Sequence, residues 1–261
     1  MTAARRPDGS AGDVDYGSIG RRYASYRQPD RRIMAHIHSA LGAARTVLNV
    51  GAGSGSYEPV DRDVTAVEPS ASMRAQRPSH VSVAVDAVAE DLPFGDRQFD
   101  ASMATFTVHQ WADVERGLAE MRRVTAGPVV ILTCDPELVE RFWLNDYAPH
   151  VLATEARRYP ALARIRAALG GSVQELGVPI PFDCSDGFNE AYYGRPEYLL
   201  DDGARLACSA WSLVPVETRE KYVEHLREAL RSGAWDAHYA YFRKLPEYHG
   251  SLRLIVASTA S

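Results

Sequence analysis

The sequence Thr46-Val-Leu-Asn-Val-Gly-Ala-Gly-Ser-Gly55 joins a short run of β-branched and apolar residues to a glycine-rich loop. Such a run is typical of a parallel strand that is buried on both faces. Glycines after a strand allow positive φ angles and let the backbone approach a ligand closely. We expect a helix after the loop, whose free N–H groups would face polar or anionic ligand atoms. The alternative interpretation is a tight strand-to-helix turn that binds nothing.

The alternation of strands and helices continues along the chain. Further strands are predicted at residues 64–67, 81–85, 99–106, 129–133, 173–180 and 250–257. Helices are predicted around residues 33–41, 118–124, 136–148, 153–169, 215–230 and 235–243. Strands that alternate with helices at this spacing indicate βαβ units and a parallel sheet with right-handed crossovers. The pattern therefore predicts the α/β class.

The composition excludes several classes of protein. The chain has 261 residues, of which 46% are hydrophobic and 24% charged, with a formal net charge of −5. These values are ordinary for a globular protein and give no basic footprint for nucleic acid. Three scattered cysteines fit neither a disulfide framework nor a zinc site, so we expect a reducing cytoplasmic setting and no metal. The apolar runs are far shorter than the roughly 20 residues of a membrane helix, and we expect no secretory signal.

The glycine loop distinguishes between two kinds of ligand. A dinucleotide-binding loop has the pattern G-x-G-x-x-G. Here the third glycine comes one residue early, at Gly55, and Ser56 stands in its place. Glu68 ends the second predicted strand, where a carboxylate can accept hydrogen bonds from both hydroxyls of a ribose. The pattern fits the pyrophosphate-free ligand S-adenosylmethionine better than a nicotinamide dinucleotide.

Ordered blocks of sequence carry a resemblance to a known family. The blocks are Val47–Gly55, Val67–Ser70, Ala89–Phe94, Gln98–Asp100, Thr105–Trp111 and Leu118–Val124. In this order and spacing they resemble the class I methyltransferase superfamily, most closely the branch of ubiquinone-type and many bacterial small-molecule methyltransferases. The resemblance covers about residues 16–134. The remainder of the chain is similar to uncharacterised bacterial relatives and indicates no substrate.

The resemblance implies a Rossmann-like, doubly wound sheet of about seven strands, with the last strand antiparallel and a helical lid inserted before it. It divides the chain into a disordered tail at residues 1–14, a helical cap at 15–45, a cofactor-binding core at 46–180, a lid and substrate insertion at 181–245 and a last core strand at 246–261.

The resemblance also implies a set of residues that bind S-adenosylmethionine. The glycine loop would lie under the methionine part, Glu68 would hold the ribose, and Pro69 or Met73 would lie against the adenine. Val88 stands where the family often has an aspartate, so Asp86 is a candidate substitute for it, or simply a turn cap. The remaining residues in the predicted set are Gly51, Ala52, Gly53, Gly55, Ala89, Glu90, Thr105 and Phe106.

An aromatic and basic segment near the N-terminus corresponds to one that folds over the cofactor in relatives. Tyr23 and Arg27 match a tyrosine and an arginine of the family there. Arg27 could pair with the carboxylate of the cofactor, because a guanidinium fork fits two oxygens. Tyr16 and Tyr26 could cover the sulfonium. Because the tyrosine spacing is helical, the alternative is that Tyr16, Tyr23 and Tyr26 form the apolar face of a helix.

Candidate catalytic residues are His109 and Tyr192. His109 follows the fourth predicted strand, and ligands bind outside the carboxyl ends of such strands. A neutral imidazole or a tyrosine there could take a proton from an acceptor hydroxyl or ammonium. The alternative for His109 is packing of the loop that follows the strand.

Candidate substrate-binding residues lie where polar groups are mixed with aromatic ones, an arrangement that suits a substrate pocket. The alternative is a capping subdomain with aromatic side chains in its core and charges in solvent. Cys184 and Asp186 belong to the same stretch, and nothing near Cys184 would activate it as a nucleophile. The predicted substrate set is Trp111, Asp183, Tyr193, Arg195 and Trp211.

The sequence thus predicts a methyltransferase that uses S-adenosylmethionine and acts on the nitrogen or oxygen of a small molecule, with natural-product tailoring as a plausible setting by analogy. Its expected partner is a small-molecule methyl acceptor, and neither nucleic acid nor membrane. Two alternatives are a nicotinamide-dependent oxidoreductase, against which Ser56 argues, and a non-catalytic relative that binds the cofactor.

Overall fold

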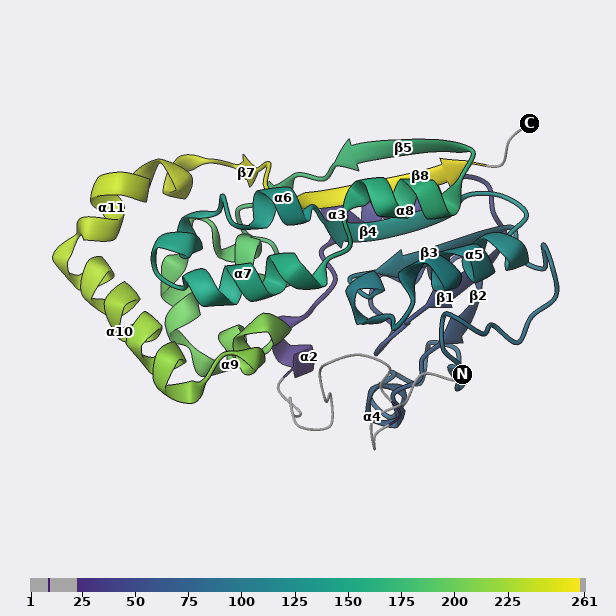
Figure 1. The fold of residues 1–261 in the computed structure, drawn as a ribbon, viewed down its shortest axis with the longest axis horizontal. Coiled ribbons are helices and arrows are strands. Elements are labelled where there is room, and N and C mark those ends of the chain that lie inside the picture. Colours follow the sequence, from purple (N-terminus) through teal and green to yellow (C-terminus); the bar gives the residue numbers. More distant parts are fainter. Residues whose placement is uncertain (1–8, 10–22, 259–261) are drawn as a thin grey trace.

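The central element of the computed structural model, which describes Gly9 and residues 23–258, is a six-stranded sheet (Figure 1). The strands follow the order β2-β1-β3-β4-β8-β5. β2, β1, β3 and β4 are parallel, and β8 runs antiparallel to both β4 and β5. This arrangement confirms the predicted Rossmann-like α/β fold with an antiparallel last strand. The strands are β1 (Thr46–Val50), β2 (Asp63–Val67), β3 (Ala101–Thr105), β4 (Val129–Cys134), β5 (Ser172–Gly177) and β8 (Leu252–Ser258).

Helices cover both faces of the sheet, which explains why its central strands are mostly apolar and buried. Successive side chains of a strand point to opposite faces. Accordingly, Val47 of β1 packs in one core cluster with Ile33 and Ile37 of α3 (Arg31–Ala40). Its neighbour Leu48 packs in a second cluster, with α5 (Val114–Val124) and α8 (Leu162–Leu169). All residues of β4 are buried, as expected for a strand covered on both faces.

A helical part lies beside the sheet, on the left in Figure 1. The indole rings of Trp143 and Trp235 meet edge to face in it, with centroids 5.3 Å apart. Trp143 precedes residue 181, so the helical part includes segments from before the predicted insertion. Its elements are α6 (Pro136–Val139), η2 (Trp143–Asp146), α7 (Pro149–Arg158), η3 (Asn189–Tyr192), η4 (Pro196–Leu200), α9 (Asp202–Leu206), η5 (Ser209–Leu213), α10 (Val216–Ser232), α11 (Ala234–Tyr239), η6 (Ala240–Lys244) and the strand pair β6 (Ile180–Pro181) and β7 (Glu247–Tyr248).

The strand predicted at residues 81–85 does not form, which is why the sheet has six strands. Only Val85 of this segment pairs with the sheet, as a single parallel bridge to Val67. The Val85 N–H donates to the Ala66 carbonyl, and the Glu68 N–H donates to the Val85 carbonyl. Val83 is 92% exposed. With no cover over it, the apolar alternation of the segment gains little from strand pairing.

The helix predicted after the glycine loop is also absent, because residues 51–62 form turns. Gly51, Gly53, Gly55 and Tyr57 all have positive φ angles, which no α-helix contains. Pro59 follows closely, and proline disfavours the helical conformation of the residue before it.

A buried ion pair stabilises the turns of residues 51–62. Glu58 accepts hydrogen bonds from Arg77 at 2.9 Å and from the Asn49 amide at 3.0 Å. The side chains of Glu58 and Arg77 are each only 4% exposed. Arg77 also donates to the carbonyl of Gly53, so the pair positions the glycine loop.

Other differences concern boundaries. The predicted helix at 136–148 is divided into α6 and η2, and the one at 153–169 into α7 and α8 around Pro160. The strand predicted at 173–180 ends at Gly177. The remaining short helices are α2 (Tyr23–Tyr26), α4 (Ala71–Arg74) and η1 (Val108–Gln110).

The predicted tail at residues 1–14 and the position of Tyr16 lie outside the described part of the chain, apart from Gly9. In residues 23–258, no helix combines the length and apolar character needed to cross a membrane.

Candidate functional site

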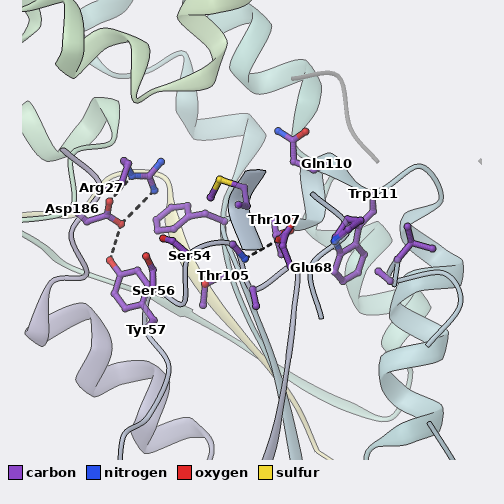
Figure 2. A pocket seen from close by; sticks show the side chains of 18 of the residues that line it. Arg27, Ser54, Ser56, Tyr57, Glu68, Thr105, Thr107, Gln110, Trp111 and Asp186 are labelled. Carbon is purple, nitrogen blue, oxygen red and sulfur yellow. Dashed lines mark hydrogen bonds and ion pairs between the residues drawn. The ribbon is translucent and has the colours of Figure 1, made fainter. Parts of the chain in front are cut away.

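A cavity opens at the carboxyl ends of β1, β2 and β3, where ligands bind in open α/β sheets (Figure 2). About 910 Å³ of space lies between its walls, part of it open to solvent. The walls are built from the residues that directly follow these three strands, from Arg27 and Asp186, and from the segments 88–90 and 110–111. The lining residues are Arg27, Gly51, Ala52, Gly53, Ser54, Ser56, Tyr57, Glu68, Pro69, Met73, Val88, Ala89, Glu90, Thr105, Phe106, Thr107, Gln110, Trp111 and Asp186.

The glycine loop forms the floor of this cavity, and its shape requires glycine. Gly51 has a φ of 69°, and a Cβ atom added there would lie 2.1 Å from the Thr107 hydroxyl oxygen. The N–H of Ala52 donates to the carbonyl of Val67 at 2.9 Å, which ties the loop to the end of β2. A side chain at Gly51 would push the loop and Thr107 apart and would distort the cavity.

Glu68 stands at the end of β2 with its carboxylate fixed by backbone N–H groups. Gly53 and Ser70 each donate to one of its oxygens at 2.8 Å. Burial raises the pKa of Glu68, and these two hydrogen bonds oppose the increase. An ionised carboxylate has about four lone-pair sites, so each oxygen can accept a further hydrogen bond from a ligand hydroxyl.

The wall formed by residues 88–90 and 110–111 contains a polar group without a partner. Both amide atoms of Gln110 are buried and have no hydrogen bond within the described residues. A ligand in the cavity could satisfy them, because buried polar groups are nearly always hydrogen-bonded. Glu90 has a structural partner, since its carboxylate accepts from the Asp113 N–H at 3.0 Å. Trp111, predicted to bind substrate, lines this cavity instead.

Two residues of the predicted cofactor set lie outside the cavity wall. Gly55 belongs to the loop but does not line the cavity. Asp86 pairs with Arg74 at 3.1 Å, and its side chain is 51% exposed. The structure thus gives no support for Asp86 as a substitute for the aspartate that Val88 replaces. Tyr23 lies in α2, but its side chain is outside the described part of the structure.

Arg27 lies in the wall with protein partners of its own (Figure 2). Its guanidinium forms an ion pair with Asp186 and lies 5.2 Å from the centre of the Phe106 ring. The Tyr57 hydroxyl donates to the same carboxylate at 2.8 Å. This arrangement links residue 27 to the predicted lid through Asp186, whose role as its partner was not predicted.

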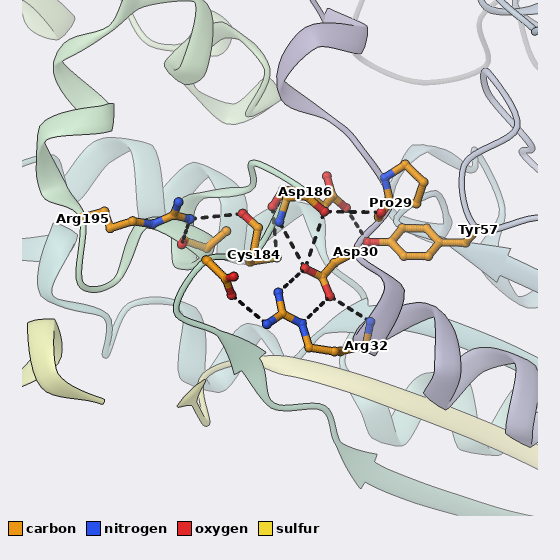
Figure 3. A network of polar contacts seen from close by, with 10 residues as sticks. Pro29, Asp30, Arg32, Tyr57, Cys184, Asp186 and Arg195 are labelled. Carbon is orange, nitrogen blue, oxygen red and sulfur yellow. Dashed lines mark hydrogen bonds and ion pairs between the residues drawn. The ribbon is translucent and has the colours of Figure 1, made fainter. Parts of the chain in front are cut away.

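A polar network around Asp30 and Ser185 lies next to this link (Figure 3). The carboxylate of Asp30 accepts from Arg32 at 2.8 Å and from the Ser185 N–H at 3.2 Å. Burial alone would raise the pKa of Asp30, but these hydrogen bonds lower it to about 2. Arg32 also pairs with Asp183, whose side chain is 75% exposed and outside the cavity. Asp183, predicted to bind substrate, thus belongs to this network.

A second cavity adjoins the first and shares Arg27 and Phe106 with it. His109 lies in its wall, and the centroid of its ring is 4.8 Å from that of Tyr159. Burial and the charges of Arg158 and Arg27 hold the pKa of His109 well below its ordinary value, so the ring is neutral near pH 7. The other lining residues are Glu155, Phe188, Ala207, Cys208, Ser209 and Ala210.

Besides Asp183, four predicted residues from the lid line neither cavity. Tyr192 is buried and stacks on Tyr198 at 5.4 Å. Tyr193 is wholly buried and donates to the Leu245 carbonyl at 2.9 Å. Arg195 donates to the Cys184 and Ala191 carbonyls, and Trp211 is 1% exposed. Because they line neither cavity, the structure does not support direct catalytic or substrate contacts for them.

Comparison with known proteins identifies the kind of protein that shares these features. The family described as "Methyltransferase domain" matches residues 48–131. A demethylmenaquinone methyltransferase from Renibacterium salmoninarum is 36% identical over 105 residues, which are 36% of this chain and 44% of that protein. Another from Paenarthrobacter aurescens is 33% identical over 127 residues, 45% of this chain and 47% of that protein. The chain thus spans less than half the length of these two curated relatives.

A crystal structure from Anabaena variabilis is similar over almost the whole chain. It is a provisionally assigned methyltransferase from an antibiotic biosynthesis pathway, 30% identical, with a TM-score of 0.84 over 90% of this chain and 100% of that one. The [4+2]-cyclase SpnF has a TM-score of 0.51 at 16% identity, over 98% of this chain and 89% of that one. The second similarity concerns the fold alone.

Proposed function

This chain belongs to the class I S-adenosylmethionine-dependent methyltransferases, and on that basis we propose that it transfers a methyl group from S-adenosylmethionine to a small molecule. The observation that carries the proposal is the cavity at the ends of β1, β2 and β3. Its lining combines the glycine loop, the carboxylate of Glu68 and the amide of Gln110, which has no hydrogen-bond partner among the described residues.

The residues present fit the cofactor. The glycine loop excludes a side chain at Gly51, where a Cβ atom would collide with Thr107, and Glu68 retains lone pairs for ribose hydroxyls. Met73 and Pro69 supply an apolar surface on the ribose side, and Ala89 lies on the opposite wall. When bound, S-adenosylmethionine supplies a methyl group on a positively charged sulfur.

The same geometry disfavours the nicotinamide alternative. A dinucleotide places its pyrophosphate at the N-terminus of the helix that follows the glycine loop. Residues 51–62 contain no helix, so the N–H groups that would hold the pyrophosphate are not aligned there. Ser56, which stands in place of the third glycine, lines the cavity.

The protein must align the acceptor atom with the methyl group and exclude water. Correct positioning can lower the free-energy barrier of such a reaction by roughly 7–11 kcal/mol. We assign the exclusion of water to a lid that comprises residues 181–245 together with α7. Asp186 brings this lid to the cavity wall through its ion pair with Arg27. Transfer to nitrogen or oxygen in natural-product tailoring is part of the proposal, supported by the pathway assigned to the Anabaena variabilis protein.

Calorimetric titration with S-adenosylmethionine, S-adenosylhomocysteine and NAD tests this proposal. We expect both sulfur ligands to bind and NAD not to bind. Binding of NAD alone would support the oxidoreductase alternative. Binding of the sulfur ligands without methyl transfer to any of a panel of phenols, alcohols and amines would favour a non-catalytic relative.

A further inference from the structure

We propose that the second cavity, behind Arg27 and Phe106, is the acceptor site, and that it takes a small aromatic molecule through a phenolic hydroxyl. This inference rests on the proposed function. About 450 Å³ of space lies between the walls of this cavity, part of it open to solvent. Because the two cavities share Arg27 and Phe106, a molecule here would lie next to the methyl donor.

The walls favour a flat, aromatic molecule. The rings of Phe106 and Phe188 are 5.3 Å apart, and those of His109 and Tyr159 form a second aromatic pair. Small side chains from the turn after α9, Ala207 among them, complete the walls. Aromatic rings prefer to pack against one another in tilted and offset arrangements.

His109 offers an acceptor for the proton of a hydroxyl. Its Nδ1 atom is buried and has no hydrogen-bond partner within the described residues. A buried polar atom without a partner is unfavourable. The ring is neutral, so Nδ1 can accept a hydrogen bond when Nε2 carries the ring hydrogen. A ligand that donates a hydrogen bond would therefore satisfy this atom.

Glu155 offers a second hydrogen-bond acceptor. Asn189 contacts its carboxylate directly, and Trp211 orients Asn189. The indole N–H of Trp211 donates to the Asn189 side-chain oxygen at 2.9 Å. An indole can only donate, so the amide of Asn189 is oriented with its nitrogen toward Glu155. That nitrogen donates to one carboxylate oxygen of Glu155 at 2.6 Å. Trp211 and Asn189 are thus positioning residues, and Glu155 lines the cavity.

The charges in the wall favour a hydroxyl over an ammonium group. Arg27 and Arg158 line the cavity with Glu155, and no other charged side chain does so among the described residues. Arg27 is paired with Asp186, so the charges around the cavity are close to balance. The charges of Arg158 and Arg27 still act on the His109 ring, where they disfavour a positive charge, and they therefore oppose a cation beside Nδ1.

The chemical step balances without a further reactant. The phenolic oxygen forms a bond to the methyl carbon as the carbon–sulfur bond of the donor breaks, with its electron pair remaining on sulfur. The phenolic proton passes to the carboxylate of Glu155, whose pKa is raised by burial, and then to solvent.

Binding of matched one-ring compounds to the protein saturated with S-adenosylhomocysteine tests the site. The probes are phenol, toluene and benzylamine, which carry a hydroxyl, no donor and a cation respectively, and their binding is measured by NMR and calorimetry. We expect phenol to bind most tightly. Absence of phenol binding, or tighter binding of benzylamine than of phenol, would overturn the proposal.

Two conservative variants locate the binding. His109→Phe retains a ring without an acceptor, and Glu155→Gln retains the shape without the charge. Each variant should weaken the binding of phenol about tenfold, which is the effect of one lost hydrogen bond to a buried group. Affinity for S-adenosylhomocysteine should remain, and His36→Ala, at an exposed histidine of α3, should change neither. Unchanged phenol binding in both variants would contradict the assignment. If S-adenosylhomocysteine does not bind at all, the proposed function fails, and phenol titration of the free protein and its variants still tests the cavity.

Discussion

Arg27 and Asp186 form an ion pair in which the side chains are only 14% and 3% exposed. The pair joins the segment before α3 to the start of the predicted lid. Gly187 strengthens this junction by donating its N–H to the Tyr26 carbonyl at 2.8 Å. The wall of the candidate cofactor cavity thus depends on a contact between two distant parts of the sequence.

Asp186→Ala should destabilise the protein strongly, because it leaves the Arg27 charge buried without this partner. Breaking a buried pair from one side costs about 3–5 kcal/mol. Denaturant unfolding measures the loss. Asp183→Ala is the matched control, since its side chain is 75% exposed, and an exposed pair contributes about 0–1 kcal/mol. Equal effects of the two changes would show that the Asp186 pair is not structurally important.

Glu68→Gln should weaken S-adenosylmethionine binding. A neutral amide accepts more weakly than a carboxylate and has only one oxygen for Gly53, Ser70 and the ligand. Hydrogen bonds to charged groups contribute about 1.5–3 kcal/mol, so we expect an affinity loss of roughly ten- to a hundredfold by calorimetry. Asp86→Asn provides the control, because Asp86 lies outside the cavity and should leave the affinity unchanged.

Gly51→Ala should impair both folding and ligand binding, whereas Gly42→Ala should impair folding only. Both glycines have positive φ angles, 69° and 59°. An alanine in this conformation costs roughly 1–2 kcal/mol. A Cβ at Gly42 meets nothing within 4 Å, but one at Gly51 meets Thr107. Unfolding and calorimetry report the two effects, and adding Thr107→Ala to Gly51→Ala should recover part of the loss. Identical behaviour of the two alanine variants would be inconsistent with the close contact.

The contribution of Glu190 to the free energy of unfolding should decrease as the pH rises from about 4.5 to about 7. Burial raises the pKa of Glu190 from 4.5 to about 7, although hydrogen bonds from Ser251 oppose the increase. Between these pH values the unfolded chain has released the proton and the folded chain retains it. Folding therefore becomes less favourable as the pH rises through this window, and the contribution is fully present only below about 4.5.

The measurement for Glu190 is the difference in unfolding free energy between the unmodified protein and Glu190→Gln across this pH range. His109 titrates in the opposite sense, because its pKa is lowered, so only the difference isolates Glu190. A difference that does not change with pH would contradict the prediction.

Local patterns predicted most strands of the sheet, the glycine loop and Glu68, and the resemblance to the family implied the other predicted residues of the first cavity. Continuous apolar runs predict buried strands. The glycine loop directly follows one such strand, and Glu68 directly follows another. The turn at 51–62 was not predicted, because its conformation depends on the ion pair of Glu58 with Arg77, which are distant in sequence.

The lid was less predictable for the same reason. Tyr192 and Tyr193 were expected near substrate, but the η3 turn and its neighbours bury both. Glu155 carried no signal in the sequence, since a carboxylate in a helix is usually solvated. Its position in the second cavity becomes evident only when Asn189 and Trp211 pack against it.

The place of β8 in the sheet has a consequence for synthesis. β8 lies between β4 and β5, and β5 pairs with no other strand of the sheet described. While the ribosome is still making the chain, β4 has an unpaired edge and β5 has no place to dock. Exposed edges of this kind are prone to pair with other chains. The nascent protein therefore depends on its final strand, residues 252–258, to complete the sheet, and shielding by chaperones would be most useful just before that strand emerges.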